Sequence, residues 1–289
     1  MTVISSTPTP IKTIGLIFNP SKIKQLRLDR AKEYARQCGL NFVFIDLERS
    51  IEEQMPFDLI VHKMSDIHGK MLNGDVNEKL KFERFLNFCT KHPHIKILDP
   101  WENVKVLLDR KSTYEMCVHA SETTIVKNLF HVPKSVFLNN NQDNIKKMNI
   151  SFPAICKRQK ACGTGESHLM VLVPSKDYLV ELQQHFELNE PVIFQEFIEH
   201  DGVLIKVYFA DGQLFTFTRP SFKNKFNSIV AFNSQKMPKS FDNNKTSTLM
   251  SSVINTDISM MKNQVNHDPL QDIANHLQNQ LGVTMFGFD

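Results

Sequence analysis

The chain has 289 residues, of which 41% are hydrophobic and 22% are charged, which is ordinary for a soluble globular protein. The formal net charge is +3, so a strongly anionic partner would need a local cluster of cations, and nothing in the total charge calls for nucleic acid. The five cysteines are odd in number and form no C-x-x-C motif, which argues against a disulfide framework or a zinc site.

The start of the chain gives no sign of export. The first ten residues, MTVISSTPTP, lack the charged start and the apolar run of a signal peptide. No apolar stretch approaches the roughly 18 residues of a membrane-spanning helix. Together with the unpaired cysteines, these features predict a cytoplasmic protein, and the length suits two or three lobes of roughly 100 residues each.

The first hundred residues alternate predicted strands with predicted helices. Helical spacing of apolar residues predicts one helix over Leu28–Cys38, with Gly39 as its stop, and another over Asn77–His92. Short apolar runs predict strands at Ile11–Phe18, Asn41–Ile45, Leu59–His62 and Ile95–Leu98. This alternation predicts an N-terminal α/β domain over 11–100, with a parallel sheet and helices on its faces.

The second hundred residues predict a lobe over 101–200. Ser112–Glu115 matches a capping box, which predicts the start of a helix. Ser175 is expected to cap a second helix that runs to about Leu188. Apolar runs predict strands at Val132–Leu138, Phe152–Lys157, Leu169–Val173 and Pro191–Ile198.

The last lobe, 201–289, is expected to begin with a hairpin. Val203–Ala210 and Gln213–Arg219 flank Asp211-Gly212, a preferred type I′ turn. The weakly periodic stretch 237–266 predicts a long surface excursion. After it, Ile273, Leu277 and Leu281 predict a helix closed by Gly282, and Val283–Phe288 predicts a final strand.

Two lysines and a glycine-containing loop are the first candidates for chemistry. Lys157 ends an apolar strand, and the loop 161–168 that follows has glycines that allow backbone N–H groups to approach phosphate oxygens. The alternative is a plain hairpin turn with a surface lysine. Lys206 lies inside a second apolar strand, where it either faces solvent or places its charge in a cleft beside a phosphate.

Other residues are weaker candidates. The segment Gln195–Ile198 links two lobes, and a linking strand with a free edge can pair with an adenine ring. Lys22 and Lys63 each follow a predicted parallel strand, at the end where ligands gather, although both are equally compatible with solvated surface lysines. Arg110 and Arg219 carry forked donors that suit phosphate.

Several motifs in this order resemble the inositol 1,3,4-trisphosphate 5/6-kinase family, also called inositol-tetrakisphosphate 1-kinases. The resemblance runs from about Ile11 to Asp289. The motifs that carry it are IEEQMPFDLIVHK (Ile51–Lys63), LLDRKSTYE (Leu107–Glu115), FPAICK with its GTGESH loop, KVYFADG followed by TRPS, and LGVTMFGFD (Leu281–Asp289).

The resemblance implies an ATP-grasp fold and an ATP- and Mg²⁺-dependent kinase. It implies that a phosphoryl group passes to a hydroxyl of soluble inositol polyphosphates, namely inositol 1,3,4-trisphosphate at position 5 or 6 and inositol 3,4,5,6-tetrakisphosphate at position 1. No nucleic-acid or membrane partner is expected, a monomer is the default, and no catalytic base is assigned.

The resemblance also implies site residues. The inositol phosphate is expected to contact Lys22, Lys63, Gly163, His168 and Lys206. ATP is expected to contact Arg110, Lys157, Gln195, Glu196, Phe197, Ile198, Lys206, Ser221 and Ser234, with Arg219 as a further phosphate contact. Asp289 matches the first metal-binding aspartate, whereas Pro238 stands where the family has another nucleotide-side serine.

The family pattern continues beyond the final strand with a D-x-N metal motif that this sequence does not contain. The expectation is therefore an ATP-grasp kinase truncated at its C-terminus, with an incomplete metal site. Two alternatives stay open: a catalytically impaired fragment that binds nucleotide and inositol phosphate, and an ATP-grasp carboxylate–amine ligase.

Overall fold

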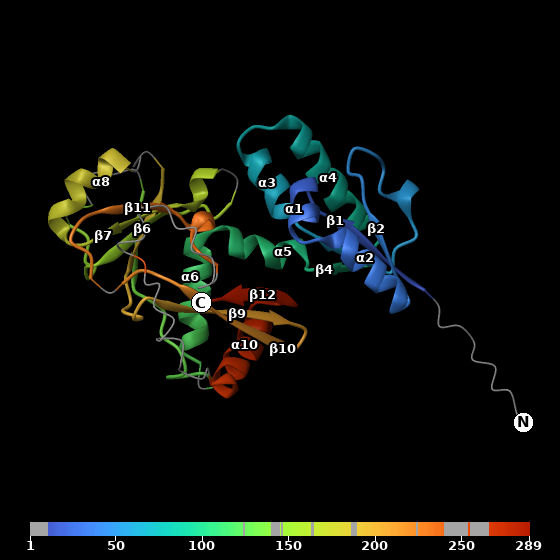
Figure 1. The fold of residues 1–289 in the computed structure, drawn as a ribbon. Coiled ribbons are helices and arrows are strands. Elements are labelled where there is room, and N and C mark those ends of the chain that lie inside the picture. Colours follow the sequence, from blue (N-terminus) through green and yellow to red (C-terminus); the bar gives the residue numbers. More distant parts are fainter. Residues whose placement is uncertain are drawn as a thin grey trace, which may run out of the picture. The chain divides into compact units, whose positions relative to one another are not determined.

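The computed structural model describes residues 11–123, 125–139, 145, 147–162, 165–185, 190–223, 225–239, 254 and 266–289 (Figure 1). The chain separates into two compact units, unit 1 over Met1–Pro100 and unit 2 over Trp101–Asp289. The expected surface excursion over 237–266 lies mostly outside the described residues. Among the helices that are described, none has both the length and the apolar character needed to cross a bilayer.

Unit 1 contains a four-stranded parallel sheet, as its sequence predicts. The strand order is β2-β1-β3-β4, with β1 at Lys12–Ile17, β2 at Leu40–Phe44, β3 at Leu59–His62 and β4 at Lys96–Leu98. Gly15 in β1 allows close packing, because a Cβ there would lie 2.5 Å from Ile45 Cδ1. Because these strands are parallel, the carboxyl ends of β1, β2 and β3 lie at the same edge of the sheet.

Four helices accompany this sheet: α1 (Pro20–Gln25), α2 (Leu28–Gln37), α3 (Met64–Leu72) and α4 (Val76–Lys91), with a 3₁₀ turn η1 at Glu52–Gln54. Asp75 caps α4 by accepting from the N–H groups of Asn77 and Glu78. One side of α4 buries Phe82, Phe85 and Phe88. Helices α2 and α4 match the predictions, whereas α1 and α3 were not predicted.

The larger sheet of unit 2 has five strands in the order β11-β7-β6-β8-β5, and all its pairings are antiparallel. The strands are β5 (Ser135–Leu138), β6 (Ala154–Arg158), β7 (Leu169–Val173), β8 (Val192–Glu196) and β11 (Val230–Asn233). Cys156, Val171, Val173, Val192 and Phe194 are buried on this sheet and form the centre of an apolar cluster. Strand β8 is an interior strand, with β6 on one side and β5 on the other.

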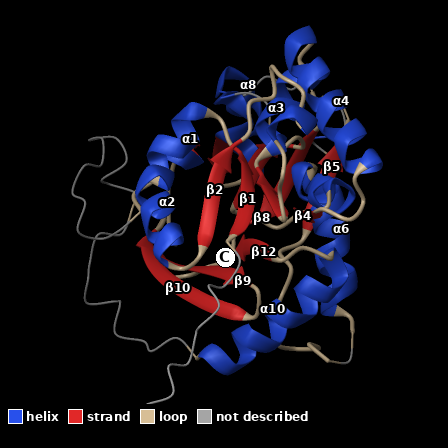
Figure 2. Ribbon diagram, turned by 90° about the vertical axis from the view of Figure 1, so that its right-hand side faces the viewer, coloured by secondary structure: helices blue, strands red, loops and turns tan. Residues whose placement is uncertain are grey.

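The smaller sheet of unit 2 has the order β10-β9-β12. Strands β9 (Val203–Ala210) and β10 (Gln213–Pro220) form the predicted hairpin, and the positive φ angles of Asp211 (46°) and Gly212 (83°) agree with a type I′ turn. Strand β12 is Met285–Phe288, and helix α10 (His267–Leu281) packs on this sheet through Ile273 and Leu277 against Phe286 and Phe288 (Figure 2).

Two predicted helix starts in unit 2 are wrong. Helix α6 (Arg110–Ser121) begins before Ser112, because Asp109 is its cap and accepts from the N–H of Ser112 at 2.8 Å. Ser175 donates to Asp177 and makes no cap bond, and a 3₁₀ turn η4 (Lys176–Tyr178) precedes α8 (Leu179–His185). The remaining short elements are α5 (Trp101–Val104), η2 (Lys105–Leu108), η3 (Gly165–His168) and η5 (Ser234–Lys236).

Candidate functional site

A cavity of about 800 Å³ lies within unit 2. Its walls come from strands β6, β8, β9 and β12, helices α6 and α10, and the segment 129–133. Five of the residues selected from the sequence line it: Arg110, Lys157, Gln195, Lys206 and Asp289. A cavity of this size, with apolar walls and a few convergent polar groups, is typical of a site for a nucleotide-sized ligand.

Lys157 is the most deeply placed cation of this cavity. Its Nζ donates to Gln195 Oε1 at 2.6 Å, and Gln195 Nε2 donates in turn to Ser135 Oγ at 3.1 Å. The register of β6 and β8 explains the contact between Lys157 and Gln195. Ile155 pairs directly with Gln195, so Lys157, two residues along, is the diagonal neighbour of Gln195 on the same face of the sheet. The lysine thus faces the cavity with a neutral partner, which excludes the plain surface lysine.

The pKa of Lys157 is lowered to about 8, first by burial and then by the nearby Arg110 guanidinium, while the Asp289 carboxylate opposes both effects. Desolvation penalises the ammonium form, because a charge in an apolar surrounding loses its hydration. Lys157 is still mostly protonated at neutral pH. An anion that arrives beside it gains more than it would beside a fully hydrated lysine.

Arg110 holds the end of β6 to the turn before β7. Its Nη1 donates to the carbonyl oxygens of Arg158 and Lys160, at 2.6 and 2.8 Å, and its Nη2 donates to that of Ser167 at 3.1 Å. The fork expected to face phosphate is therefore bonded largely to backbone. A phosphate contact by Arg110 stays a prediction, and its structural role is to fix the strand that carries Lys157.

Lys206 and Arg219 lie in strands β9 and β10 of the smaller sheet, and Asp289 directly follows its third strand, β12. Phe288 pairs with Val207, so Asp289 follows beside Lys206, and its Oδ1 lies 3.0 Å from Lys206 Nζ. Arg219 Nη2 is 3.9 Å from the same oxygen. The sequence left open whether Lys206 faces solvent or a cleft, and the structure places it in the lining of the cavity.

The described lining of the cavity has few side chains that could hold a metal ion. Asp289 contributes the single carboxylate of the cavity's described lining, and the described residues contain no group of three or more His, Cys, Asp or Glu side chains arranged for a metal. Mg²⁺ is usually held by one or two carboxylates together with substrate phosphates and water. The lining therefore fits a metal that arrives with a nucleotide, and it does not form a metal cage by itself.

The linking segment Gln195–Ile198 differs from expectation. Its first two residues belong to the interior strand β8, and the Phe197 N–H donates to Pro153, so the expected free edge is absent over Gln195–Phe197. Glu196 Oε1 accepts from the Lys134 N–H at 2.7 Å and faces His131 at 3.2 Å, and the Lys134 bond helps lower the pKa of this carboxyl. Phe197 is buried and Ile198 is exposed, and Gln195 alone of the four lines the described cavity.

Other predicted residues lie outside the described lining. Ser221 is buried, with its Oγ 2.7 Å from His200 Nε2, and Ser234 begins η5. His168 ends η3, while Gly163 lies outside the described residues. Pro238 follows η5 and is partly buried.

The two lysines of unit 1 follow parallel strands, as predicted. Lys22 is in α1, directly after β1, and its Nζ donates to Gln25 Oε1 at 2.8 Å. Lys63 directly follows β3, and its Nζ donates to Ser65 Oγ at 3.1 Å. Lys63 lines a hollow of about 340 Å³ within unit 1, and Lys22 is not part of that lining.

Sequence reasoning missed the apolar side of the large cavity. Tyr114 and Cys117 from α6, Phe130 and Val132 from the following segment, and Leu270 from α10 line it. One signal was available, because the apolar stripe of α10 was recognised from Ile273 and Leu277, which also line the cavity. The segment 129–133 has no periodicity that would have marked it.

Two family models match this chain. The inositol 1,3,4-trisphosphate 5/6-kinase ATP-grasp domain matches residues 124–289. The inositol 1,3,4-trisphosphate 5/6-kinase pre-ATP-grasp domain matches residues 13–104. The first match alone covers more than half of the chain.

Similar proteins agree with these models. The inositol-tetrakisphosphate 1-kinase of Xenopus laevis is 28% identical over 286 residues, which cover 96% of this chain and 69% of that protein. The enzyme of the same name from Danio rerio is 29% identical over 290 residues, with the same coverage.

Solved structures support the architecture. The ATP-grasp ligase PsnB, complexed with minimal precursor, superposes with a TM-score of 0.55 over 96% of this chain and 85% of that one, at 14% identity. At this identity the likeness shows the fold alone. The prediction of a mixed α/β chain with the ATP-grasp fold is confirmed.

Proposed function

Because this chain belongs to the inositol 1,3,4-trisphosphate 5/6-kinase family, as its motifs predict, it is an inositol phosphate kinase, and we propose its substrates and the residues that bind them. The proposed donor is ATP. The proposed acceptors are inositol 1,3,4-trisphosphate, at position 5 or 6, and inositol 3,4,5,6-tetrakisphosphate, at position 1. The Xenopus and Danio relatives named for the second activity support this choice.

One observation carries the proposal. Lys157 in β6, Lys206 in β9 and Asp289 directly after β12 line one cavity large enough for a nucleotide. Phosphoryl transfer needs little covalent help from a protein, because positioning and charge neutralisation provide most of the catalysis. Two ammonium groups beside a carboxylate are suited to that task.

In this proposal ATP occupies the cavity with its base against the apolar walls and its phosphates toward the lysines. The residues proposed to contact it are Arg110, Lys157, Gln195, Glu196, Phe197, Ile198, Lys206, Ser221 and Ser234, with Arg219 near the phosphates. Lys157 leaves a neutral glutamine when it turns to a phosphate, so no ion pair has to be broken. Lys206 is shared between Asp289 and the ligand.

Mg²⁺ is the proposed metal, and Asp289 would hold it together with the nucleotide phosphates. When bound, the metal supplies charge neutralisation and orientation of the phosphates. Without it, the Asp289 carboxylate is balanced by Lys206 and Arg219. The Asp289 carboxylate thus lies in the cavity lining with two cations beside it.

The inositol phosphate is proposed to contact Lys22 and Lys63 in unit 1, and Gly163, His168 and Lys206 in unit 2. A small ring with several phosphates needs several cations pointed at it, although the whole protein need only be slightly basic. A cytoplasmic location and a monomeric state complete the proposal, in keeping with the five free cysteines.

The test is turnover with defined acceptors. Purified protein with ATP and Mg²⁺ is incubated with inositol 1,3,4-trisphosphate or inositol 3,4,5,6-tetrakisphosphate, and products are separated by anion-exchange chromatography. We expect ADP and one added phosphate in equal amounts. Inositol without phosphates serves as the control acceptor and should give neither.

Lys157→Ala should lower this turnover by about a thousandfold, and Lys176→Ala, which changes an exposed lysine of η4, should leave it unchanged. ADP formation with a carboxylate and an amine, but with no inositol phosphate, would replace the proposal by the ligase alternative. ATP binding without any transfer would favour a catalytically impaired binding protein.

A further inference from the structure

The hollow in unit 1 lies where three parallel strands end. Its lining includes residues that directly follow β1, β2 and β3, together with residues of α3 and α4, and its volume is about 340 Å³. The described lining carries three lysines, Lys63, Lys70 and Lys81, and four carboxylates. Its position is that of a ligand site in a parallel sheet, but its charge balance does not suit a ligand with many phosphates.

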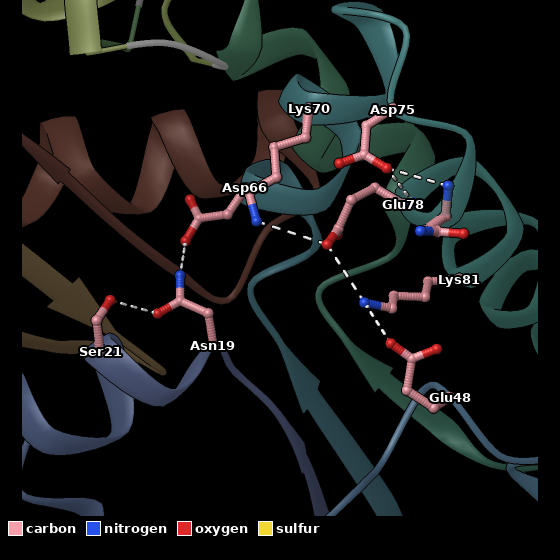
Figure 3. A network of polar contacts seen from close by, with 9 residues as sticks. Asn19, Ser21, Glu48, Asp66, Lys70, Asp75, Glu78 and Lys81 are labelled. Atoms are coloured by element: carbon pink, nitrogen blue, oxygen red, sulfur yellow. Dashed lines mark hydrogen bonds and ion pairs between the residues drawn. The ribbon is translucent and has the colours of Figure 1, made fainter.

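Glu78 is the centre of this charge arrangement (Figure 3). Its Oε1 lies 3.5 Å from Lys70 Nζ and 3.3 Å from Lys81 Nζ. Lys81 Nζ also lies 2.7 Å from Glu48 Oε1. The Glu78 and Lys81 side chains are only 12% and 19% exposed, so water screens their attraction less than at the open surface.

Lys63 differs from the other two lysines. Its recorded bond goes to the neutral hydroxyl of Ser65, and none of the described ion pairs joins it to a carboxylate. The neighbouring acid, Asp66, accepts instead from Asn19 Nδ2 at 2.6 Å (Figure 3). Within the described hollow, Lys63 therefore keeps its positive charge for a ligand, and Lys70 and Lys81 have theirs compensated.

We infer that Glu78 is a specificity-determining residue, which limits the number of substrate phosphates that unit 1 binds by pairing with Lys70 and Lys81. This inference rests on the proposed function, in which Lys63 contacts an inositol phosphate. A phosphate that approaches Lys70 or Lys81 must compete with Glu78 and is also repelled by it. An acceptor with fewer phosphates meets no such barrier.

The experiment replaces Glu78 by its neutral isostere. In Glu78→Gln the amide oxygen still accepts from the lysines, but the repelling charge is gone. We expect the KM for the tetrakisphosphate to fall about tenfold relative to that for the trisphosphate, the scale of one added charge-assisted hydrogen bond. The kcat for each acceptor should stay within about twofold, because no group near ATP changes.

Glu83→Gln is the matched control. It removes the same charge from the same helix, where Glu83 forms an exposed pair with Lys79 at 3.8 Å. Glu48→Gln is a second test at an exposed position, and it releases Lys81 from one partner. We expect a shift of about threefold in the same direction for Glu48→Gln and no shift for Glu83→Gln. The shifts should shrink in 0.5 M salt, a response that a merely structural role of Glu78 would not give.

Calorimetric titration with inositol hexakisphosphate separates the possible failures. If the wild-type protein phosphorylates no inositol phosphate, the proposed function fails, and the titrations still show whether Glu78→Gln tightens binding. Suppose instead that the wild-type protein turns over both acceptors. If the ratio of the KM values for the two acceptors is then no different in Glu78→Gln and Glu48→Gln from that in Glu83→Gln, the inference about Glu78 is overturned. Thermal unfolding of each variant confirms that folded proteins are compared.

Discussion

The small hollow of unit 1 and the large cavity of unit 2 have equal numbers of lysine and arginine side chains in their described linings but opposite charge balances. The large cavity of unit 2 has Arg110, Lys157 and Lys206 facing one described carboxylate, that of Asp289. The hollow of unit 1 sets its three lysines against four carboxylates. Cationic side chains thus outnumber carboxylates in one described lining and are outnumbered by them in the other.

The difference lies in the partners that each lysine is given. Lys157 donates to an amide and Lys63 to a hydroxyl, so both hydrogen-bond partners are neutral. Lys70 and Lys81 are paired with carboxylates and contribute little net charge. A count of basic residues therefore overstates the attraction of unit 1 for phosphate.

The largest effect is expected for Lys157→Ala. Removal of this partly buried ammonium should lower kcat/KM by about a thousandfold, as expected when a cation that stabilises transferring phosphate is lost. Steady-state kinetics measure the loss, and calorimetric titration with ADP should show weakened binding. A reduction of only a few-fold would contradict the proposal that the cavity of unit 2 binds polyanions better than the hollow of unit 1 does.

Asp289→Asn should have two opposed effects. Turnover with Mg²⁺ should fall by about a hundredfold, because the proposed metal carboxylate is lost. Metal-free ATP should bind several-fold more tightly, because Lys206 and Arg219 are released from their ion pairs. Titrations with and without EDTA distinguish the two. Weaker metal-free binding would contradict the idea that this carboxylate offsets the cations.

Nucleotide affinity should depend on pH through Lys157. Its pKa is lowered to about 8, so the ammonium is present below that pH and is lost as the pH rises through it. Metal-free ATP affinity should therefore be flat from pH 6.5 to 7.5 and fall by up to about tenfold per unit between pH 8 and 10. Lys157→Arg keeps its charge over this range and should flatten the profile. A wild-type profile without a fall would place the titration elsewhere.

The smallest effect is expected for Gly15→Ala in the parallel sheet. The new Cβ would lie 2.5 Å from Ile45 Cδ1 and 3.1 Å from Phe57 Cδ1, so these side chains must shift. We expect a loss of about 1–2 kcal/mol in the unfolding free energy of unit 1, with ADP binding by unit 2 unchanged. Denaturant unfolding and ADP titration together measure this. Loss of ADP binding would show that the two units do not act separately.

Much of the fold was predictable from local pattern. Strands β3 and β9 have the predicted bounds, because each is a short apolar run with clear stops. Strand β11 was missed, since Val230–Asn233 is a short strand at the edge of its sheet, where one neighbour suffices and alternation is weak. The start of α6 was misplaced because Asp109 competes with Ser112 as a cap, and sequence alone does not rank them.

The candidate site was predictable in its residue types and less so in its partners. Lys157 and Lys206 stand out as charges within apolar strands. Their contacts depend on the order of the strands, because β8 lies beside β6 and β12 lies beside β9. No local sequence motif predicts this order. For the same reason, the sequence did not predict the bonds of Arg110 to backbone carbonyl groups or the ion pairs of Glu78 with Lys70 and Lys81.

The division of the chain at Pro100 also bears on how such enzymes can diverge. Every described lining residue of the small hollow lies between positions 17 and 81, and every described lining residue of the large cavity lies beyond position 106. A single genetic exchange near codon 100 would therefore transfer the described lining of the small hollow between related genes and leave the described lining of the large cavity unchanged. The charge balance around Glu78 is thus free to evolve apart from the cations that line the large cavity.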